Sequence, residues 1–301
     1  FRGLSRIGSG VGRLMWRLLP SRRRLATQNV ARHLNLPEEQ ARDIARSAFR
    51  HNARSFMEIL LTDRFGMDFP ELRIGEPELF QQLKNCSRPI VAATAHLGAW
   101  ELLASMLGEL YEPPRPRMVV VRRYPNPAVQ AFISSRREAR GATMVGHRTV
   151  VPAVLRALRK NGIVAFLVDH NAPRSEALFL PFMGEETAVN MGPALLAVRA
   201  EALIWPVCLM REGNGYVFHL QEPLDTATLK GSIGGRNVLY KGCGKSRAAR
   251  AGAMVLDAQP LETAPVRLIP ASSPTGLTEP LRKTACPPPG PETRLSFLPP
   301  P

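Results

Sequence analysis

The chain has 301 residues, 45% of them apolar, which is enough for one large domain or two ordinary ones and excludes a disordered composition. The formal net charge of +15 favours an anionic partner: nucleic acid, a membrane surface or a phosphorylated substrate. The four cysteines lie far apart without a CxxC pair, which argues against a disulfide scaffold or a zinc ribbon, and no run of about 18 apolar residues predicts a transmembrane helix.

Residues 1–80 are predicted to form a helical N-terminal region. Apolar residues recur at helical spacing from Leu4 to Leu19 with arginines between them, which predicts a basic amphipathic helix. Such a helix can lie in an anionic membrane interface, and the alternative is a helix packed on the domain core. A second helical region is expected around residues 37–65.

Residues 81–230 are predicted to form an α/β domain with a largely parallel central sheet flanked by helices. Short β-branched runs alternate with amphipathic stretches in this region. Strands are expected at 89–95, 118–121, 163–168, 203–209 and 216–221, and helices at 97–110, 132–140, 151–160 and 191–199.

The composition changes after about residue 230. Twelve of the 28 prolines lie in residues 231–301, where neither a helical nor a strand period is sustained. This tail is expected to be either disordered or an out-of-frame translation of the true C-terminus. Its nine Lys/Arg and four Asp/Glu give +5, so +10 of the +15 belongs to residues 1–230.

Two ionisable residues, His96 and Glu101, interrupt an apolar stretch at the point where a strand is expected to end and a helix to begin. Open α/β sheets bind ligands at this edge. Gly98 between them would let another group approach the backbone closely, and the nearby helix N-terminus favours negative charge. Side chains five residues apart on a helix point about 140° apart, and no further His/Cys cluster supplies ligands, so no metal site is predicted.

The pattern favours acid–base chemistry. His96 can accept a proton near neutral pH, and Glu101 can orient its ring by a hydrogen bond. No GxSxG nucleophile elbow is present, so the expected nucleophile is a hydroxyl of the substrate, with oxyanion donors expected near Gly98. The alternative is a core histidine beside a surface glutamate.

The spacing His96-x4-Glu101 resembles the His-x4-Asp/Glu motif of glycerolipid-type acyltransferases, a lysophospholipid acyltransferase-like superfamily. Further motifs resemble those of the lipid A biosynthesis (lauroyl/myristoyl) acyltransferase family in the same order. They are the basic segment 22–34, Val-Val-Arg-Arg-Tyr-Pro-Asn-Pro at 120–127, Phe-Leu-Val-Asp-His at 166–170, Phe-Leu-Pro-Phe-Met-Gly at 179–184 and the helix-like run 192–199. The likeness spans residues 1 to about 228.

The resemblance implies a glycerolipid acyltransferase-like fold and a role for several residues. His96 would be the general base and Glu101 its orienting partner. Arg137 matches a family arginine important for activity, Asp169 falls on an acidic family position, and Arg122 and Gly98 are expected at the substrate. The alternatives are a solvated helix charge for Arg137 and a strand-end cap for Asp169.

The resemblance also implies the partners. The expected donor is an acyl carrier protein thioester and the expected acceptor an anionic glycolipid, a lipid A precursor, at the cytoplasmic face of the bacterial inner membrane, with the chain peripheral or anchored by its N-terminus. No metal or organic cofactor is implied. One alternative acceptor is a phosphatidylinositol mannoside. A noncatalytic basic nucleic-acid- or membrane-binding protein is the alternative of another class; nucleic acid is disfavoured because only 6% of residues are aromatic and no binding motif is present.

Overall fold

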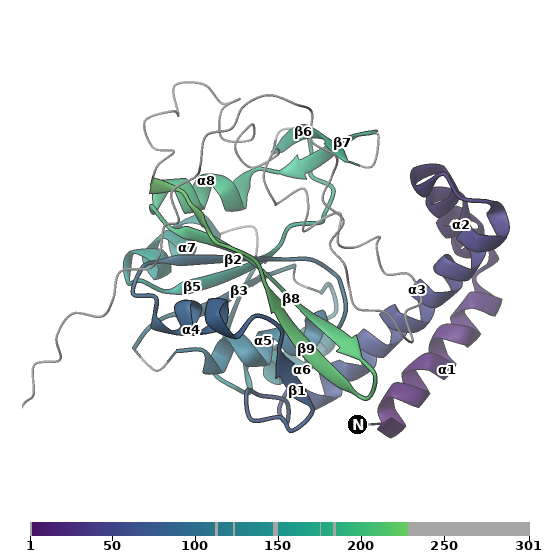
Figure 1. Cartoon of the computed structure of the whole chain (residues 1–301), viewed down its shortest axis with the longest axis horizontal. Coiled ribbons are helices and arrows are strands. Elements are labelled where there is room, and N and C mark those ends of the chain that lie inside the picture. Colours follow the sequence, from purple (N-terminus) through teal and green to yellow (C-terminus); the bar gives the residue numbers. More distant parts are fainter. Residues whose placement is uncertain are drawn as a thin grey trace, which may run out of the picture.

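The computed structural model describes residues 2–227 apart from 112–113, 123, 147–149, 175 and 183–184. The predicted tail at 231–301 therefore lies outside the described residues. Within them the protein is a mixed α/β fold, as predicted, with an arm of helices projecting from one side of the sheet domain (Figure 1). None of the described helices is long and apolar enough to cross a membrane.

The projecting arm consists of three helices, and a short 3-10 turn joins it to the sheet domain. These are α1 (Arg2–Leu18), α2 (Pro20–Leu34), α3 (Glu38–Glu58) and η1 (Ile59–Leu61). The predicted helix at the N-terminus is confirmed, and it packs on α3 through its small residues: a Cβ at Gly12 would lie 2.6 Å from the Arg50 Cα. Trp16 completes this contact edge-on to Phe49, with ring centroids 5.2 Å apart.

The central sheet runs in the order β1-β9-β8-β2-β5-β3-β4, with β10 paired to β8. Its strands are β1 (Leu72–Ile74), β2 (Ile90–Thr94), β3 (Arg117–Val121), β4 (Thr143–Gly146), β5 (Ile163–Leu167), β8 (Leu203–Glu212), β9 (Gly215–Leu220) and β10 (Leu224–Asp225). The five strands from β8 to β4 in this order are parallel, whereas β9 and β10 run antiparallel to β8. A separate antiparallel hairpin joins β6 (Ala177–Phe182) and β7 (Glu185–Asn190).

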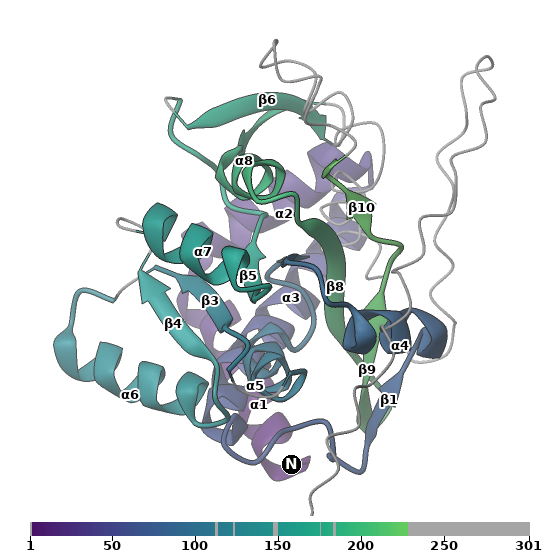
Figure 2. The same cartoon turned by 90° about the vertical axis from the view of Figure 1, so that its left-hand side faces the viewer.

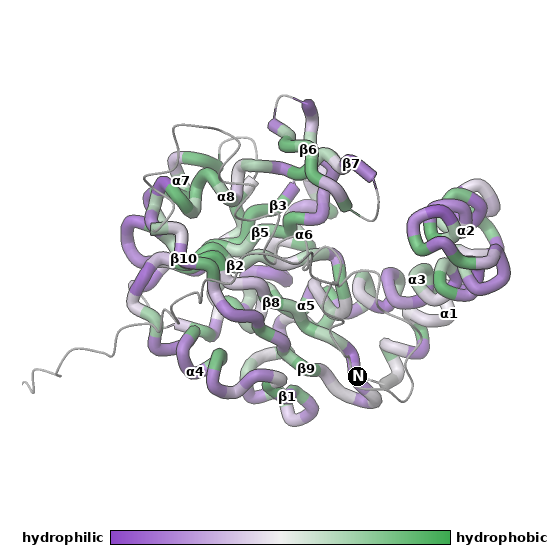
Figure 3. The backbone as a smooth tube through the Cα atoms, turned by 45° about the horizontal axis from the view of Figure 1, so that its top comes forward, coloured by the Kyte–Doolittle hydropathy of each residue, from purple (hydrophilic) through white to green (hydrophobic). Residues whose placement is uncertain are grey.

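Helices cover both faces of the sheet (Figure 2). They are α4 (Pro77–Asn85), α5 (Trp100–Glu109), α6 (Pro127–Glu138), α7 (Val150–Arg159) and α8 (Gly192–Arg199). One core cluster lies between the sheet, α4 and α5, and a second lies between the sheet, α7 and α8. Hydrophobic residues accordingly follow the central strands, while α2 is largely hydrophilic (Figure 3).

Strand β2 lies between β5 and β8, and all five of its residues are buried. Its sequence, Ile-Val-Ala-Ala-Thr, can be buried on both faces because it carries no charge, as parallel central strands require. Because β2 and β5 are parallel neighbours, the residues that follow both strands meet at one edge of the sheet.

Candidate active site

His96 lies two residues beyond the end of β2, in a tight turn where the Leu97 backbone N–H donates to the Ala95 carbonyl. Gly98 then has φ +60°, and a Cβ there would lie 2.2 Å from the Leu209 carbonyl oxygen. The close approach expected at Gly98 is therefore made by β8 of the same chain. Gly98 is not among the cavity-lining residues described below, and its absent side chain serves the turn that presents His96.

The carboxylate that hydrogen bonds to the His96 ring is that of Asp169, which follows β5. The Nδ1–Oδ1 distance is 2.9 Å, and the other oxygen, Oδ2, accepts from the His96 backbone N–H, also at 2.9 Å. Burial would raise the pKa of the Asp169 carboxyl, but the hydrogen bonds from His96 outweigh it and hold that pKa below its ordinary value. An ionised Asp169 keeps the proton of His96 on Nδ1 and leaves Nε2 as a proton acceptor.

Glu101 makes a different contact. Its two oxygens accept hydrogen bonds from Nε and Nη2 of Arg137 at 2.9 and 2.8 Å. Burial raises the pKa of the Glu101 carboxyl, and the Arg137 guanidinium opposes that rise. The expectation that Glu101 orients His96 by a hydrogen bond is thus corrected, because Glu101 turns from the first turn of α5 toward α6 while Asp169 occupies Nδ1.

Arg137 is not the solvated helix charge that the sequence left open. It is 8% exposed, and its guanidinium carbon lies 5.9 Å from the centre of the Trp100 ring. The Trp100 ring in turn packs edge-on against His96, with centroids 4.7 Å apart. The Glu101–Arg137 pair therefore supports the wall of the site beside His96, and both residues line the cavity described below.

A second histidine, His170, contacts His96 from the other side, with ring centroids 4.6 Å apart. Sequence reasoning missed it, although it directly follows Asp169. Among the described residues, His96, Asp169 and His170 are the one group whose ligand atoms, all within 4.8 Å of one another, could hold a metal ion. The premise that no further ligands lie near His96 is therefore wrong, because pairing of β2 with β5 brings together residues 73 positions apart.

A cavity of about 2010 Å³ opens beside His96. Its part between the sheet and α5, here called the apolar chamber, is lined by Leu83, Ala92, Leu103, Met106, Leu107, Leu110, Val119, Ala165, Trp205 and Phe218. Ala92 and Ala165 are partners in the sheet, and their small side chains leave room above it. The cavity as a whole is large enough for a long hydrocarbon chain, and this part of its lining is apolar.

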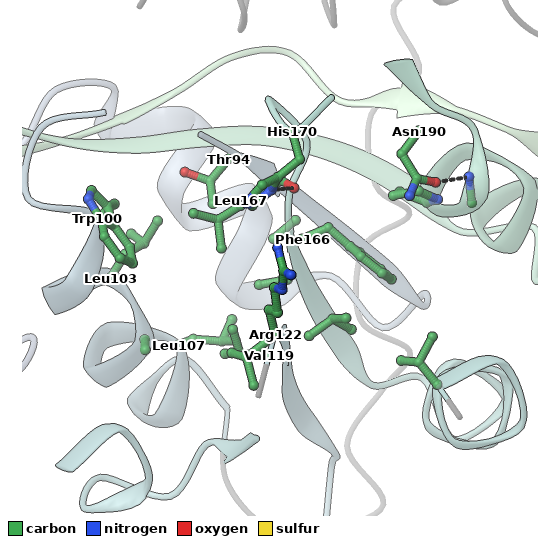
Figure 4. A pocket seen from close by; sticks show the side chains of 18 of the residues that line it. Thr94, Trp100, Leu103, Leu107, Val119, Arg122, Phe166, Leu167, His170 and Asn190 are labelled. Carbon is green, nitrogen blue, oxygen red and sulfur yellow. Dashed lines mark hydrogen bonds between the residues drawn. The ribbon is translucent and has the colours of Figure 1, made fainter. Parts of the chain in front are cut away.

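The rest of the cavity is more polar. Its lining on this side includes Arg122, His170, Asn190 and Arg199. Figure 4 shows Arg122 pointing up toward Phe166 from the end of β3, with Asn190 across the cavity from Trp100 and Leu103. Arg122 thus lines the same cavity as His96, and this cavity has an apolar compartment and a more polar one.

The chain matches the family model "Bacterial lipid A biosynthesis acyltransferase" over residues 1–231. The chain belongs to the bacterial lipid A biosynthesis acyltransferase family. The match to this acyltransferase family ends beside the change in composition at about residue 230, and it includes every candidate site residue named above.

Curated relatives bear a related name. A phosphatidylinositol mannoside acyltransferase from Mycolicibacterium smegmatis is 27% identical over 148 residues, 48% of this chain and 47% of that protein. Phosphatidylinositol mannoside acyltransferases from two Mycobacterium tuberculosis strains are each 29% identical over 139 residues, 45% of this chain and 43% of theirs. The matched part spans about half the length of these curated relatives.

Proposed function

We propose that the protein is an O-acyltransferase that moves a fatty acyl chain from a thioester to a hydroxyl of an anionic glycolipid. The observation that carries the proposal is the His96–Asp169 pair, whose histidine lines the cavity that contains the apolar chamber. Membership of an acyltransferase family supports it.

In this reaction His96 Nε2 removes the proton from the acceptor hydroxyl as its oxygen attacks the thioester carbonyl carbon. Asp169 stabilises the imidazolium that forms. When the tetrahedral intermediate collapses, the carbon–sulfur bond breaks and the imidazolium returns the proton to the departing thiolate. The step forms one ester and one thiol and needs no covalent enzyme intermediate.

The donor that we propose is an acyl carrier protein thioester, whose acyl chain would occupy the apolar chamber. The net charge of +10 on residues 1–230 complements an acidic carrier protein. For the acceptor, a lipid A precursor follows from the family name. A phosphatidylinositol mannoside is the second candidate, favoured by the names of the relatives. Both are anionic and would suit Arg122 and Arg199 in the polar compartment.

We propose further that the protein works at the cytoplasmic face of the bacterial inner membrane as a peripheral protein or one anchored by its N-terminus. Large apolar side chains stay exposed along α1, among them Ile7, Leu14 and Leu18, at 56%, 54% and 66%. Residues 1–37 carry eight arginines and no acidic residue. Exposed leucines beside arginines favour contact with an anionic lipid surface.

The test is an acyl-transfer assay on the full chain with acyl carrier protein thioester and vesicles holding either a lipid A precursor or a phosphatidylinositol mannoside. Wild type should consume thioester and acylate one acceptor, and His96→Ala should abolish turnover without changing the circular dichroism spectrum. Turnover that survives in His96→Ala would exclude His96 as the base. Thioester stable with both acceptors, together with a salt-sensitive DNA shift, would instead favour the noncatalytic binder.

A further inference from the structure

Thr94, the last residue of β2, carries a buried hydroxyl that the structure leaves unused. The residue is 5% exposed, and no described residue hydrogen bonds to its Oγ1. Its side chain lines the cavity together with His96 and Leu103. In Figure 4 the hydroxyl oxygen points toward the side of the cavity where Trp100 and Leu103 lie.

A buried hydroxyl without a partner costs free energy, and a valine of nearly the same shape would avoid that cost. Other buried threonines in this protein do find partners. The Thr62 hydroxyl, for example, bonds to the carbonyls of Ile59 and Arg136. Thr94, the exception, is two residues from the proposed base His96. A donor without a protein partner is expected at such a position if it hydrogen bonds to an oxygen of the substrate.

The position of Thr94 relative to His96 suits an oxyanion donor. The two residues are two positions apart, so their Cα atoms are at most about 7 Å apart, and both side chains line the cavity. In acyl transfer, the base lies about 3 Å from the attacking oxygen and an oxyanion donor about 3 Å from the carbonyl oxygen. A thioester carbonyl bound between Thr94 and His96 would have the donor and the base on either side of it.

The direction of the acyl chain agrees with this placement. Ala92 precedes Thr94 by two residues on the same strand and lines the apolar chamber. A carbonyl held at Thr94 would send its hydrocarbon chain over Ala92 and its sheet partner Ala165 into that chamber.

Several of the donors expected from the sequence are engaged elsewhere. Arg137 donates from Nε and Nη2 to Glu101. The backbone N–H groups on either side of Gly98, those of Leu97 and Ala99, donate to the carbonyls of Ala95 and Leu209.

Among the described residues, two buried donors that line the cavity have no partner, Thr94 Oγ1 and Trp205 Nε1. Trp205 belongs to the apolar chamber, whereas Thr94 is two residues from His96.

We propose that the Thr94 hydroxyl donates a hydrogen bond to the thioester carbonyl oxygen and holds the oxyanion that develops there as the acceptor attacks. This role deepens the proposed acyl transfer and rests on it. Thr94 would be a catalytic residue together with His96, with Asp169 positioning His96.

The experiment compares Thr94→Val and Thr94→Ser with wild type in the acyl-transfer assay and in thermal unfolding. Thr94→Val should lower kcat by about 10²- to 10³-fold, the loss typical of one oxyanion donor, with KM changed less than about threefold. Its Tm should be equal to or above that of wild type, because an unpaired hydroxyl is removed. Thr94→Ser keeps the donor and should retain kcat within about tenfold.

Thr62→Val is the matched control, because its hydroxyl is buried and paired. It should lower Tm while leaving kcat per folded molecule unchanged. Thr94→Val with kcat within threefold of wild type, or Thr94→Ser as inactive as Thr94→Val, would overturn the role of Thr94. A fall in Tm for Thr94→Val that accounts for its lost activity would overturn it too. Wild type without turnover on either acceptor would refute the acyl transfer itself.

Discussion

The two carboxylates near His96 differ in where their hydrogen bonds go. Both oxygens of Asp169 hydrogen bond to His96, one to the ring and one to the backbone N–H. Asp169 therefore fixes the His96 ring relative to the His96 main chain. Glu101 gives both oxygens to Arg137 in a pair that is 1% and 9% exposed at the two side chains. The His96–Asp169 pair is therefore suited to proton transfer, and the Glu101–Arg137 pair to stabilising the cavity wall beside it.

Asp169→Asn should abolish most turnover while the fold is kept. The His96 backbone N–H requires an acceptor, so the asparagine oxygen would stay there and its NH₂ would face Nδ1. Nδ1 must then accept a hydrogen bond from that NH₂ group, so the ring proton moves to Nε2. A protonated Nε2 cannot accept the proton of the acceptor hydroxyl. We expect kcat to fall by about 10²- to 10⁴-fold, measured beside circular dichroism. A variant as active as wild type would exclude Asp169 as the positioning residue.

Glu101→Gln should reduce stability more than Asp169→Asn does. A glutamine offers one acceptor where Arg137 needs two, and it leaves a buried guanidinium without a counter-charge. Breaking such a buried pair costs about 3 to 5 kcal/mol. Urea unfolding of both variants at pH 7 checks this, and equal midpoints would contradict the structural role assigned to Glu101.

Asp169 also predicts how stability depends on pH. Its folded pKa is lowered, so between that value and the unfolded value near 3.9 the unfolded chain binds more protons. The contribution of the Asp169 carboxylate to the free energy of unfolding is therefore present above about pH 4. It is lost as the pH falls through the lowered folded pKa. Urea unfolding from pH 5 to pH 3 should show a smaller loss in Asp169→Asn than in wild type. An identical loss would contradict the pKa shift.

At the scale of elements, periodicity located the strands that are long and buried. The expected strand at 163–168 is β5, Ile163–Leu167, and that at 89–95 is β2, Ile90–Thr94. The short edge strands β1 and β4 and the β6–β7 hairpin were missed, because three or four residues, or a hairpin interrupted by proline, carry little period. The tail at 231–301 stays a prediction.

The order of strands explains the two errors at the site, which concern the partner of His96 and the further ligands near it. Periodicity along the chain does not tell that β5 lies beside β2, and without that order the carboxylate nearest in sequence, Glu101, was the natural partner for His96. The run Leu-Val-Asp-His at the end of a buried strand indicated that Asp169 and His170 are candidate site residues. That they lie beside His96 follows only once β5 is known to pair with β2.

The contact of α1 with α3 depends on one glycine and yields an element-scale prediction. A Cβ at Gly12 would lie 2.6 Å from both the Arg50 Cα and the Phe49 carbonyl oxygen, so Gly12→Ala must push backbone atoms apart. We expect a loss of about 1 to 3 kcal/mol in unfolding free energy. Gly10→Ala is the control, because nothing lies within 4 Å of its Cβ, and it should stabilise α1 by about 0.5 to 1 kcal/mol.

Chemical denaturation of the two alanine variants distinguishes these effects. A Gly12→Ala variant as stable as Gly10→Ala would mean that α1 does not rest on α3 as the structure has it. Faster hydrogen exchange in α1 of Gly12→Ala alone would locate the loss in this contact.

At the scale of the whole molecule, α1 and the cavity mouth expose the same kind of surface. The sequence left open whether the apolar side of α1 packs on the core. The structure packs the glycine side instead, and Leu14 and Leu18 remain exposed. Three cavity-lining residues, Phe56, Val151 and Leu195, are also exposed, at 56%, 47% and 40%. Exposed apolar residues both on α1 and at the cavity suit an enzyme whose substrates are drawn from a lipid surface.

Leu14→Ser and Leu18→Ser together should therefore weaken binding to anionic vesicles without changing stability. Each leucine that enters the lipid interface contributes about 1.5 to 3 kcal/mol, so the double variant should bind at least tenfold more weakly in co-sedimentation.

Arg13→Gln and Arg17→Gln together should instead weaken binding mainly at low salt, because the attraction of these arginines to anionic lipid is already screened at high salt. Neutral vesicles serve as the control and should be bound less well by wild type. Unchanged binding in the leucine variant would mean that α1 does not enter the lipid, and the lipid contact would then have to lie at the cavity rim.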